Sequence, residues 1–357
     1  MAKILAIDLG KFKSVTCLLK TETNETEFWT MSTDRQYLLT VLKNYDPDLV
    51  VIESCGLAGW VHDVCTEEGY QVLVCNPNQE AWKWKNVKRK TDRDDALKLA
   101  KLAALGQLVP VYIPSRPQRE YRRLVKYRQV LLGRMNRVQN NIRAIFVQRG
   151  MPMVRGQKAW ASERFELLAQ YRQPLSECTL DGLWHGELDL ELTELDQLRT
   201  QYLQVQRKLK GLALADERVR LLQTIPGVGR KTAEVVVAYL DDPKRFKNAR
   251  QVSSYAGLVP RRHQSGETDR HGHIHKHGPR QLRGALVEAA WMMLRYNPWA
   301  KSVYERLTGG QKTRKKKAIV AVARKLLVRC WVMLLRKEPW KKEEATIGAG
   351  GVTVAAV

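Results

Sequence analysis

The order of the apolar patterns in the first hundred residues limits the fold more than any other feature of this sequence. Three strand-like runs come first, and helical and strand patterns then alternate. The run LVVI at 49–52 is continuously apolar, which is typical of a strand covered on both faces. The expected elements are strands at 3–9, 14–19, 27–31, 49–52 and 71–75 and helices at 35–44, 59–68 and 94–105. This order predicts a mixed α/β domain that ends near residue 110, where VPVYIPSRP supplies turn residues.

The chain is strongly basic. Its 357 residues include 61 Lys and Arg against 37 Asp and Glu, a formal net charge of +24, while the hydrophobic share of 44% suits a globular protein. Such a charge attracts polyanions, so nucleic acid is the expected partner. No apolar run approaches the roughly 18 residues of a membrane helix, and MAKILAIDLG lacks the order of a signal peptide. We therefore expect a cytoplasmic protein with no membrane partner, and its positive charge suits association with a prokaryotic nucleoid.

Two long helical stripes follow the α/β domain. Apolar residues recur at three- and four-residue steps across 116–149 and across 188–209, which predicts packed helices, either as an antiparallel hairpin or as a dimer-forming coiled coil. The stretch 116–149 holds ten Lys and Arg and a single acid, Glu120, whereas a solvated face normally mixes signs. We expect its basic face to contact nucleic-acid backbone through Arg122, Arg123, Arg134 and Arg137.

The segment 221–240, LLQTIPGVGRKTAEVVVAYL, has the pattern of helix, tight turn and helix. Gly227 and Gly229 can adopt backbone angles closed to other residues and leave amides free to bind phosphate at the start of the second helix. A nucleotide-binding Walker loop is the competing interpretation, but it needs glycine where Arg230 stands. The pattern therefore favours a helix-hairpin-helix DNA-binding motif.

The region that starts near residue 212 is expected to be mainly helical, with a basic helix at 312–336. The predicted domains are 1–110, a helical linker and dimerisation region at 111–211, a C-terminal domain at 212–345 and a disordered tail at 346–357.

Four acidic residues stand where an α/β domain presents functional groups. Asp8 ends the first strand in ILAIDLG, and Glu53 ends the LVVI strand in IESCG. Asp92 and Asp95 in TDRDDA are three residues apart at the start of a helix and so share a face. Buried carboxylates need a cation or hydrogen-bond donors, and this order of acids holds two divalent metals in phosphodiester chemistry. We predict that the four acids are catalytic and converge on one site that binds Mg²⁺ or Mn²⁺.

The same TDRDDA segment also allows a structural role. Thr91 or Asp92 could cap the helix N-terminus, while Asp94 points away from the face that Asp92 and Asp95 share.

The segment directly before it, WKWKNVKRKT at 82–91, places two tryptophans among cations. Cations that bind phosphate beside aromatics that stack on bases are expected where a strand enters a metal site. A solvated basic loop is the alternative. The cations predicted to bind nucleic acid are Lys83, Lys85, Lys88, Arg89 and Lys90.

A cationic segment at 255–283, YAGLVPRRHQSGETDRHGHIHKHGPRQLR, surrounds Ser265. Ser-Gly in a polar loop is usually a turn, but nearby cations could neutralise a phosphate while His263 or a metal-bound hydroxide takes the serine proton. Five of the seven histidines lie within 263–277, in a spacing that suits a phosphate-facing loop better than zinc. The cations predicted to bind nucleic acid are Arg261, Arg262, Lys276 and Arg280, with Arg270 nearby.

These features in their order resemble one family. With the four acids, the helix-hairpin-helix, GLVPRRHQSG and GHIHKHG, the chain resembles the insertion sequence one-ten family of transposases, DEDD-type enzymes related to Piv invertases. The resemblance covers residues 1 to about 340, and KTDRDDA and the serine loop are its most specific parts. It departs at His275, where members often have threonine.

The resemblance implies a fold and a reaction. The expected fold is an α/β RuvC-like (ribonuclease H-like) N-terminal domain, a helical coiled-coil linker and a mainly α C-terminal transposase domain. The implied site combines metal bound by Asp8, Glu53, Asp92 and Asp95 with a nucleophile at Ser265, which cuts and rejoins donor and target DNA. The resemblance further implies dimers or tetramers whose two parts of the site meet between subunits, and guidance by a structured non-coding bridge RNA.

Other classes of protein compete with this hypothesis. A RuvC-like Holliday-junction nuclease would need only the acids and would be indifferent to Ser265. An actin-like ATPase also opens with a strand and IDLG, but its second phosphate loop and adenosine motif are missing from this sequence. A non-catalytic RNA-binding protein would explain the charge and none of the acids. A covalent protein–DNA adduct separates a serine recombinase from a two-metal hydrolase; under RNA guidance, base pairing would choose the target.

Overall fold

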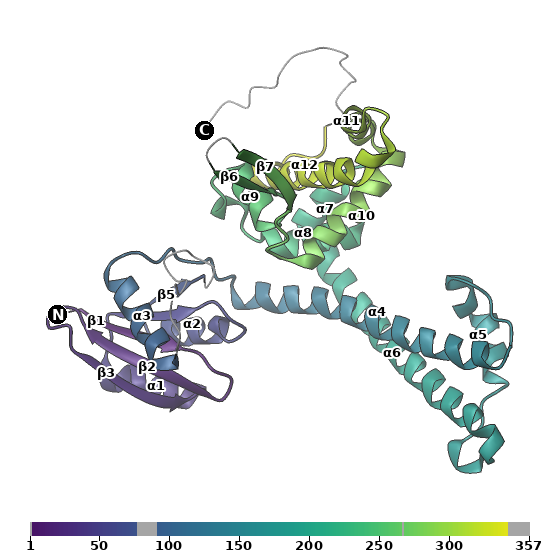
Figure 1. Cartoon of the computed structure of the whole chain (residues 1–357), viewed down its shortest axis with the longest axis horizontal. Coiled ribbons are helices and arrows are strands. Elements are labelled where there is room, and N and C mark those ends of the chain that lie inside the picture. Colours follow the sequence, from purple (N-terminus) through teal and green to yellow (C-terminus); the bar gives the residue numbers. More distant parts are fainter. Residues whose placement is uncertain (1, 77–90, 266–267, 342–357) are drawn as a thin grey trace. The chain divides into compact units, whose positions relative to one another are not determined.

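The computed structural model describes residues 2–76, 91–265 and 268–341. The chain divides into two compact units, Met1–Arg119 and Glu120–Val357, each with its own buried core (Figure 1). Within the described ranges, no helix combines the length and apolar character needed to cross a membrane. The predicted tail at 346–357 lies outside these ranges, and the predicted boundaries at 110 and 211 stay predictions.

The first unit is built around one five-stranded mixed sheet. Its strand order is β3-β2-β1-β4-β5, in which β1, β2 and β3 are antiparallel neighbours while β4 and β5 run parallel to β1. The elements are β1 (Lys3–Asp8), β2 (Lys13–Lys20), β3 (Thr26–Ser32), α1 (Arg35–Tyr45), β4 (Leu49–Glu53), α2 (Ala58–Glu67), β5 (Gln71–Cys75) and α3 (Asp92–Ala104). Each strand and helix predicted for the first hundred residues is present, which confirms the mixed α/β domain.

Alternation along the central strands sends side chains to two separate cores. The face packed on α1 and α2 carries Leu5, Ile7, Val50 and Ile52, and the face packed on α3 carries Ile4, Ala6 and Val51. Because β1 and β4 are buried on both faces, their sequences are continuously apolar. The place of a residue in this alternation therefore tells on which face of the sheet it lies.

Two long helices, α4 (Arg116–Gln148) and α6 (Leu183–Ala215), lie side by side (Figure 1). Phe146 near the end of α4 meets Trp184 at the start of α6, with ring centroids 6.3 Å apart, so the helices run antiparallel. The segment that joins them contains η2 (Gln157–Trp160), α5 (Ser162–Ala169), η3 (Leu175–Glu177) and η4 (Leu180–Gly182).

Most apolar residues of the two predicted stripes form one buried cluster between these helices, which includes Leu131 of α4 and Leu188 of α6. Leu124 and Leu209 pack into the C-terminal core instead, and the side chain of Tyr127 is 39% exposed. Packing within one chain accounts for the stripes; a coiled coil between subunits stays a prediction.

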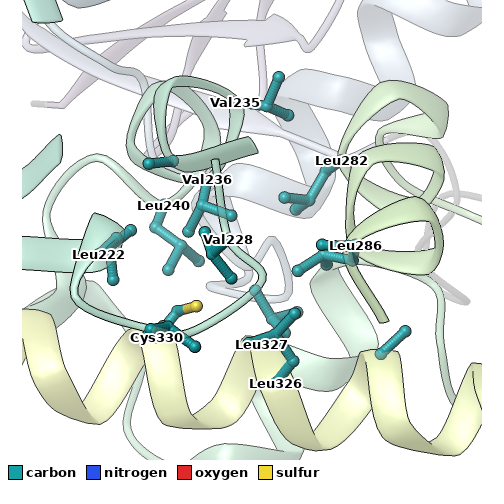
Figure 2. Packing of buried hydrophobic residues seen from close by; sticks show 14 of the residues in the cluster. Leu222, Val228, Val235, Val236, Leu240, Leu282, Leu286, Leu326, Leu327 and Cys330 are labelled. Carbon is teal, nitrogen blue, oxygen red and sulfur yellow. The ribbon is translucent and has the colours of Figure 1, made fainter. Parts of the chain in front are cut away.

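The C-terminal part of the second unit is a helical core with one β-hairpin. Its elements are α7 (Glu217–Gln223), α8 (Arg230–Leu240), η5 (Pro243–Arg245), α9 (Ala249–Tyr255), β6 (Pro260–Ser265), β7 (Thr268–Ile274), α10 (Arg280–Tyr296), α11 (Pro298–Thr308), η6 (Lys312–Arg314) and α12 (Lys315–Arg336). Figure 2 shows Val236 and Leu240 of α8, Leu286 of α10 and Leu327 of α12 converging on this core. The predicted mainly helical C-terminal region is confirmed.

Candidate active site

Asp8 and Glu53 leave neighbouring strands at the same edge of the sheet. β1 and β4 are parallel and stay in register up to the residue before each acid. Asp8 pairs with Val15 and Glu53 with Cys75, and both partners belong to the core on the α3 side. Burial, and then the nearby Glu53 carboxylate, raises the pKa of the Cys75 thiol to about 11. The two acids therefore share one face of the sheet, the face that α3 covers.

The first turn of α3 carries the remaining two acids, and its cap separates their roles. Thr91 is the N-cap: its side-chain oxygen accepts a hydrogen bond from the Asp94 amide (3.2 Å), and the Asp94 carboxylate accepts one from the Thr91 amide (3.0 Å). This capping box engages Thr91 and Asp94 rather than Asp92 or Asp95. Asp95 is 8% exposed and lies on the stripe that buries Leu99 against the sheet, whereas Asp92, one turn earlier, is exposed.

The donor set suits a hard divalent cation. Carboxylate oxygens are the ligands that Mg²⁺ and Mn²⁺ prefer, and Asp8, Glu53 and Asp95 belong to the same side of the sheet. Across residues 2–76, 91–265 and 268–341, no three His, Cys, Asp or Glu side chains are already gathered to hold one ion. The strands and the helix thus bring three of the predicted acids to one face, and their convergence on metal stays a prediction.

Ser265 is the last residue of β6 and pairs with Thr268, the first residue of β7. The hairpin therefore presents Ser265 next to its closed end. The two predicted cations Arg261 and Arg262 also lie on β6, near a shift in the strand register.

The base of this hairpin is fixed by a close crossing of two backbone segments. Gly278 has φ +100°, and a Cβ there would lie 2.1 Å from the Tyr255 carbonyl oxygen; Gly257 has φ +65°, and its Cβ would lie 2.0 Å from the His277 carbonyl oxygen. The Arg283 guanidinium adds a bond of 3.1 Å to the Gly278 carbonyl oxygen. Both glycines are required because neither backbone leaves room for a side chain.

Positive groups gather at the same base. Arg261, Lys276 and Arg280 are all exposed, and the rings of His275 and His277 are 4.2 Å apart. Desolvation, followed by the charges of His277 and Arg261, lowers the pKa of His275. His275 is therefore held toward its neutral form, and the exposed cations beside it are the groups that could face a phosphate.

The helix, turn and helix predicted at 221–240 are present as α7, a turn and α8, but other parts of the chain cover much of this segment. Its interpretation as a helix-hairpin-helix DNA-binding motif stays a prediction. Gly227 has φ +91°, and a Cβ there would lie 2.8 Å from the Met293 Cα, so packing on α10 explains this glycine. The Lys231 ammonium donates to the Tyr202 hydroxyl (3.1 Å), and the Thr224 hydroxyl accepts a bond from the Trp340 amide (2.9 Å). Gly229 is exposed with open space around it. Its phosphate-binding role stays a prediction, whereas Gly227 has a structural reason.

The predicted basic face of α4 contains residues of two kinds. Arg123, Arg134 and Arg137 are exposed and available to an outside partner. Arg122 is turned inward: its Nε donates to the Ala238 carbonyl oxygen (3.0 Å), and its guanidinium lies 5.1 Å from the centre of the Tyr239 ring. Arg122 therefore joins α4 to α8.

Sequence reasoning missed a buried ion pair at the same joint. Arg128 of α4 is bonded to Glu234 of α8, and these residues are 5% and 0% exposed. The Nε atom of Arg230 lies 3.1 Å from the Oε1 atom of the same Glu234 carboxylate. The available signal was a glutamate inside the apolar stretch TAEVVVAYL, since a buried acid requires a cation.

The five cations predicted at Lys83, Lys85, Lys88, Arg89 and Lys90 lie outside the described residues. The side chains of Arg262, His263 and Ser265 are likewise outside the description, so for these residues the structure gives the strand position alone.

Two family profiles match this chain. One, described as a transposase and covering DEDD transposases of the IS110 type, matches residues 5–150; the other, described as "Transposase IS116/IS110/IS902 family", matches residues 219–305.

Individual relatives agree with the profiles. The transposase for insertion sequence element IS1111A of Coxiella burnetii is 29% identical over 95% of this chain and 91% of its own length. The probable family 20 transposase of Pseudomonas aeruginosa is 27% identical over 78% of this chain and 80% of its own. The pilin gene-inverting protein of Moraxella lacunata is 38% identical over 35% of this chain and 39% of its own. The Thermus thermophilus RuvC structure aligns with 30% of this chain and 99% of that chain at 17% identity, with a TM-score of 0.24, which carries no weight for the fold.

These matches define an enzyme that cleaves and rejoins DNA. The chain belongs to the IS116/IS110/IS902 family of transposases, with a DEDD transposase domain at its N-terminus, and its reaction is DNA recombination by transposition. DEDD domains of this class generally use divalent metal ions.

Proposed function

We propose that this transposase cuts and rejoins DNA through Ser265, assisted by Mg²⁺ or Mn²⁺ bound at Asp8, Glu53, Asp92 and Asp95. The observation that carries the metal half is that Asp8 and Glu53 end adjacent parallel strands on the face covered by α3, whose first turn buries Asp95. Three carboxylates brought to one face of a sheet repel one another, and a divalent cation relieves that repulsion.

The four acids would have separate tasks. Asp8 and Glu53 would bind from the sheet, Asp95 from α3, and the exposed Asp92 would complete the set from the same helix face. When bound, the metal would neutralise charge on the phosphate and favour departure of the leaving oxygen. The capping box keeps Asp94 out of this set and fixes the start of α3, which holds the direction of Asp95.

The serine half follows the chemistry of a covalent intermediate. The Ser265 oxygen would attack the phosphorus of a DNA phosphodiester, forming a bond from phosphorus to serine while the bond from phosphorus to a deoxyribose oxygen breaks. The serine proton leaves through a base such as His263, and the departing sugar oxygen is protonated. Attack of a sugar hydroxyl on the phosphoserine reverses these steps, so strands rejoin without ATP. Arg261, Lys276 and Arg280 would neutralise the phosphate during both steps.

The proposed assembly includes DNA, a structured bridge RNA and a second copy of the chain. The acids and Ser265 belong to different compact units, so a partner subunit could complete either half of the site. The exposed Arg123, Arg134 and Arg137 of α4 offer backbone contacts to either nucleic acid without reading sequence. Base pairing with the RNA would then choose the DNA target.

The deciding experiment traps the covalent intermediate. Denatured reactions of the full chain with labelled donor DNA are analysed for protein-linked DNA, comparing Ser265→Ala with Thr268→Ala, which removes the hydroxyl of the residue paired with Ser265. We expect Ser265→Ala to lose the adduct and recombination while DNA and RNA binding persist, and Thr268→Ala to keep the adduct. If Ser265→Ala still cleaves and rejoins DNA, the acids alone carry the chemistry and the Holliday-junction type of nuclease is the better description.

A further inference from the structure

The C-terminal part of the chain carries a second group of cations, away from the serine hairpin in sequence. Between 298 and 341 the sequence holds thirteen Lys and Arg and two acids, Glu305 and Glu338. Both acids already have partners: Lys301 lies 4.0 Å from Glu305, and Lys341 lies 2.9 Å from Glu338. The other cations of this stretch therefore face an excess of positive charge.

The densest part of this group is the start of α12. Lys312, Arg314, Lys315, Lys316 and Lys317 are all exposed. Within the described part of the chain, none of these five side chains forms an ion pair. Two glycines with positive φ, Gly309 at +52° and Gly310 at +75°, end α11 and turn the chain so that η6 leads directly into α12. The run of cations is thus held on ordered backbone.

The position of the lysines on the helix is electrostatically unfavourable in the free protein. The N-terminus of a helix carries a partial positive charge, and the first turn of α12 consists of Lys315, Lys316 and Lys317. Its N-cap residue, Arg314, provides no side-chain acceptor for the first amides. A bound anion would satisfy those amides and neutralise the lysines together.

The positive charge continues along the same helix. Arg324 lies two turns after Lys317 on the same face, about 10 Å further along the axis. Partial burial, followed by the charges of Arg306 of α11 and of Arg324, lowers the pKa of Lys325. Like charges are therefore close enough to repel one another across α11 and α12.

The neighbouring aromatics are already used within the fold, which argues against base stacking at this surface. The Arg329 guanidinium lies 4.3 Å from the centre of the Trp299 ring and 5.0 Å from that of Trp340. The stretch 309–317 is polar and charged, with no large hydrophobic side chain. Contacts here would therefore be made to phosphate rather than to bases or to an apolar protein surface.

We propose that the α12 basic surface, defined as Arg306, Lys312, Arg314, Lys315, Lys316, Lys317, Arg324 and Lys325, binds the phosphate backbone of double-stranded DNA. It would hold the duplex independently of its sequence and outside the reacting centre. DNA is the ligand chosen because the enzyme acts on it and because exposed lysine charges clustered at the start of α12 can neutralise several neighbouring phosphates.

The test measures the salt dependence of DNA binding by the full chain. The duplex has arbitrary sequence and the buffer contains EDTA, so bound metal does not contribute to the result, and the hairpin that carries Ser265 is the same in every protein compared. The variant replaces Lys315, Lys316 and Lys317 by Gln together; because cations are unfavourable at a helix N-terminus, the helix should keep its stability. Each lost phosphate contact lowers the slope of log K against log salt by about 0.9, so we expect a slope shallower by about 2–3.

The matched control removes three exposed cations from another helix of the same unit, through Arg207→Gln, Lys208→Gln and Lys210→Gln on α6. The control should change the slope of log K against log salt by less than the value of about 0.9 that corresponds to one phosphate contact. An unchanged slope in the α12 variant overturns the proposal, and so does an equal change in the control, because net charge would then explain both. If the α12 variant loses affinity for duplex RNA and keeps it for duplex DNA, the surface belongs to RNA and the assignment to DNA is wrong.

Discussion

The two halves of the proposed active site are held in place by different kinds of structure. Asp8 and Glu53 continue buried parallel strands whose register is set by neighbouring residues, so their shared edge follows from the sheet itself. Ser265 lies at the end of a two-stranded hairpin whose position depends on Gly257 and Gly278 at its base. A site formed by strand ends is therefore positioned by the sheet itself, whereas a site on a hairpin depends on the few backbone contacts that anchor the hairpin.

The largest expected effect is a difference in DNA cleavage rate between variants of two neighbouring aspartates of α3. Asp95→Asn should lower DNA cleavage by roughly 100-fold or more, because it removes a carboxylate from the proposed metal site. Asp94→Asn should keep cleavage within a few-fold, since the Asp94 carboxylate serves the capping box. Cleavage rates measured over a range of Mg²⁺ and Mn²⁺ concentrations check this. Equal loss in both variants would show that α3 acts through its fold rather than through a metal ligand.

The second prediction concerns the joint between α4 and α8. Glu234→Ala leaves Arg128 buried without its partner, and breaking a buried ion pair costs about 3–5 kcal/mol. The denaturant midpoint of the second unit should fall, while the first unit should unfold as before. The double variant Arg128→Met with Glu234→Leu should recover part of the loss, because it removes both buried charges and leaves only the partly exposed Arg230 without its carboxylate. No recovery in the double variant would mean that the pair also sets the packing of the two helices.

The third prediction weakens the anchor of the serine hairpin. Gly278→Ala places a Cβ 2.1 Å from the Tyr255 carbonyl oxygen at a positive φ, so it should destabilise the second unit by more than about 1 kcal/mol. Adduct formation should fall with it. Gly284→Ala is the control in the nearby α10: its site is open and helical, so alanine should stabilise the unit by about 0.5–1 kcal/mol. If both variants react equally fast, the crossing does not position Ser265.

The sequence predicted those parts of the protein that depend on pattern alone. Alternating apolar runs gave the five strands and the place of Glu53, and the three-residue spacing gave the shared face of Asp92 and Asp95. Side-chain partners depend on which helix packs against which, and no local pattern contains that information. Arg122 was therefore predicted to face nucleic acid, although its guanidinium bonds to α8, and the pairing of Arg128 with Glu234 was missed.

The role of a glycine is also not predictable from the local sequence alone. Gly227 was assigned to phosphate because a glycine-rich turn before a helix often binds anions. The structure places the backbone of α10 against it, at a distance that leaves no room for a Cβ. A glycine in a sequence indicates that a side chain is not tolerated, but the neighbour that excludes it, ligand or protein, becomes visible only when distant helices are packed.

The smallest expected effect comes from changing the N-cap of α3, which fixes the helix that carries Asp92 and Asp95. Thr91→Ala removes the N-cap oxygen and should lower the free energy of unfolding of the first unit by about 0.5–2 kcal/mol. Hydrogen bonds from Thr91 hold the pKa of the Asp94 carboxyl below its usual range, so the stability they confer is present above the unfolded pKa and is lost as pH falls through the folded pKa. The variant should therefore lose less stability on acidification than the parent protein. Unfolding of the first unit at neutral and acidic pH measures both effects.

Cleavage should drop only a few-fold, because Asp95 keeps its place in the buried stripe; a drop as large as that of Asp95→Asn would mean that the cap, and not the sheet, determines where the acids meet.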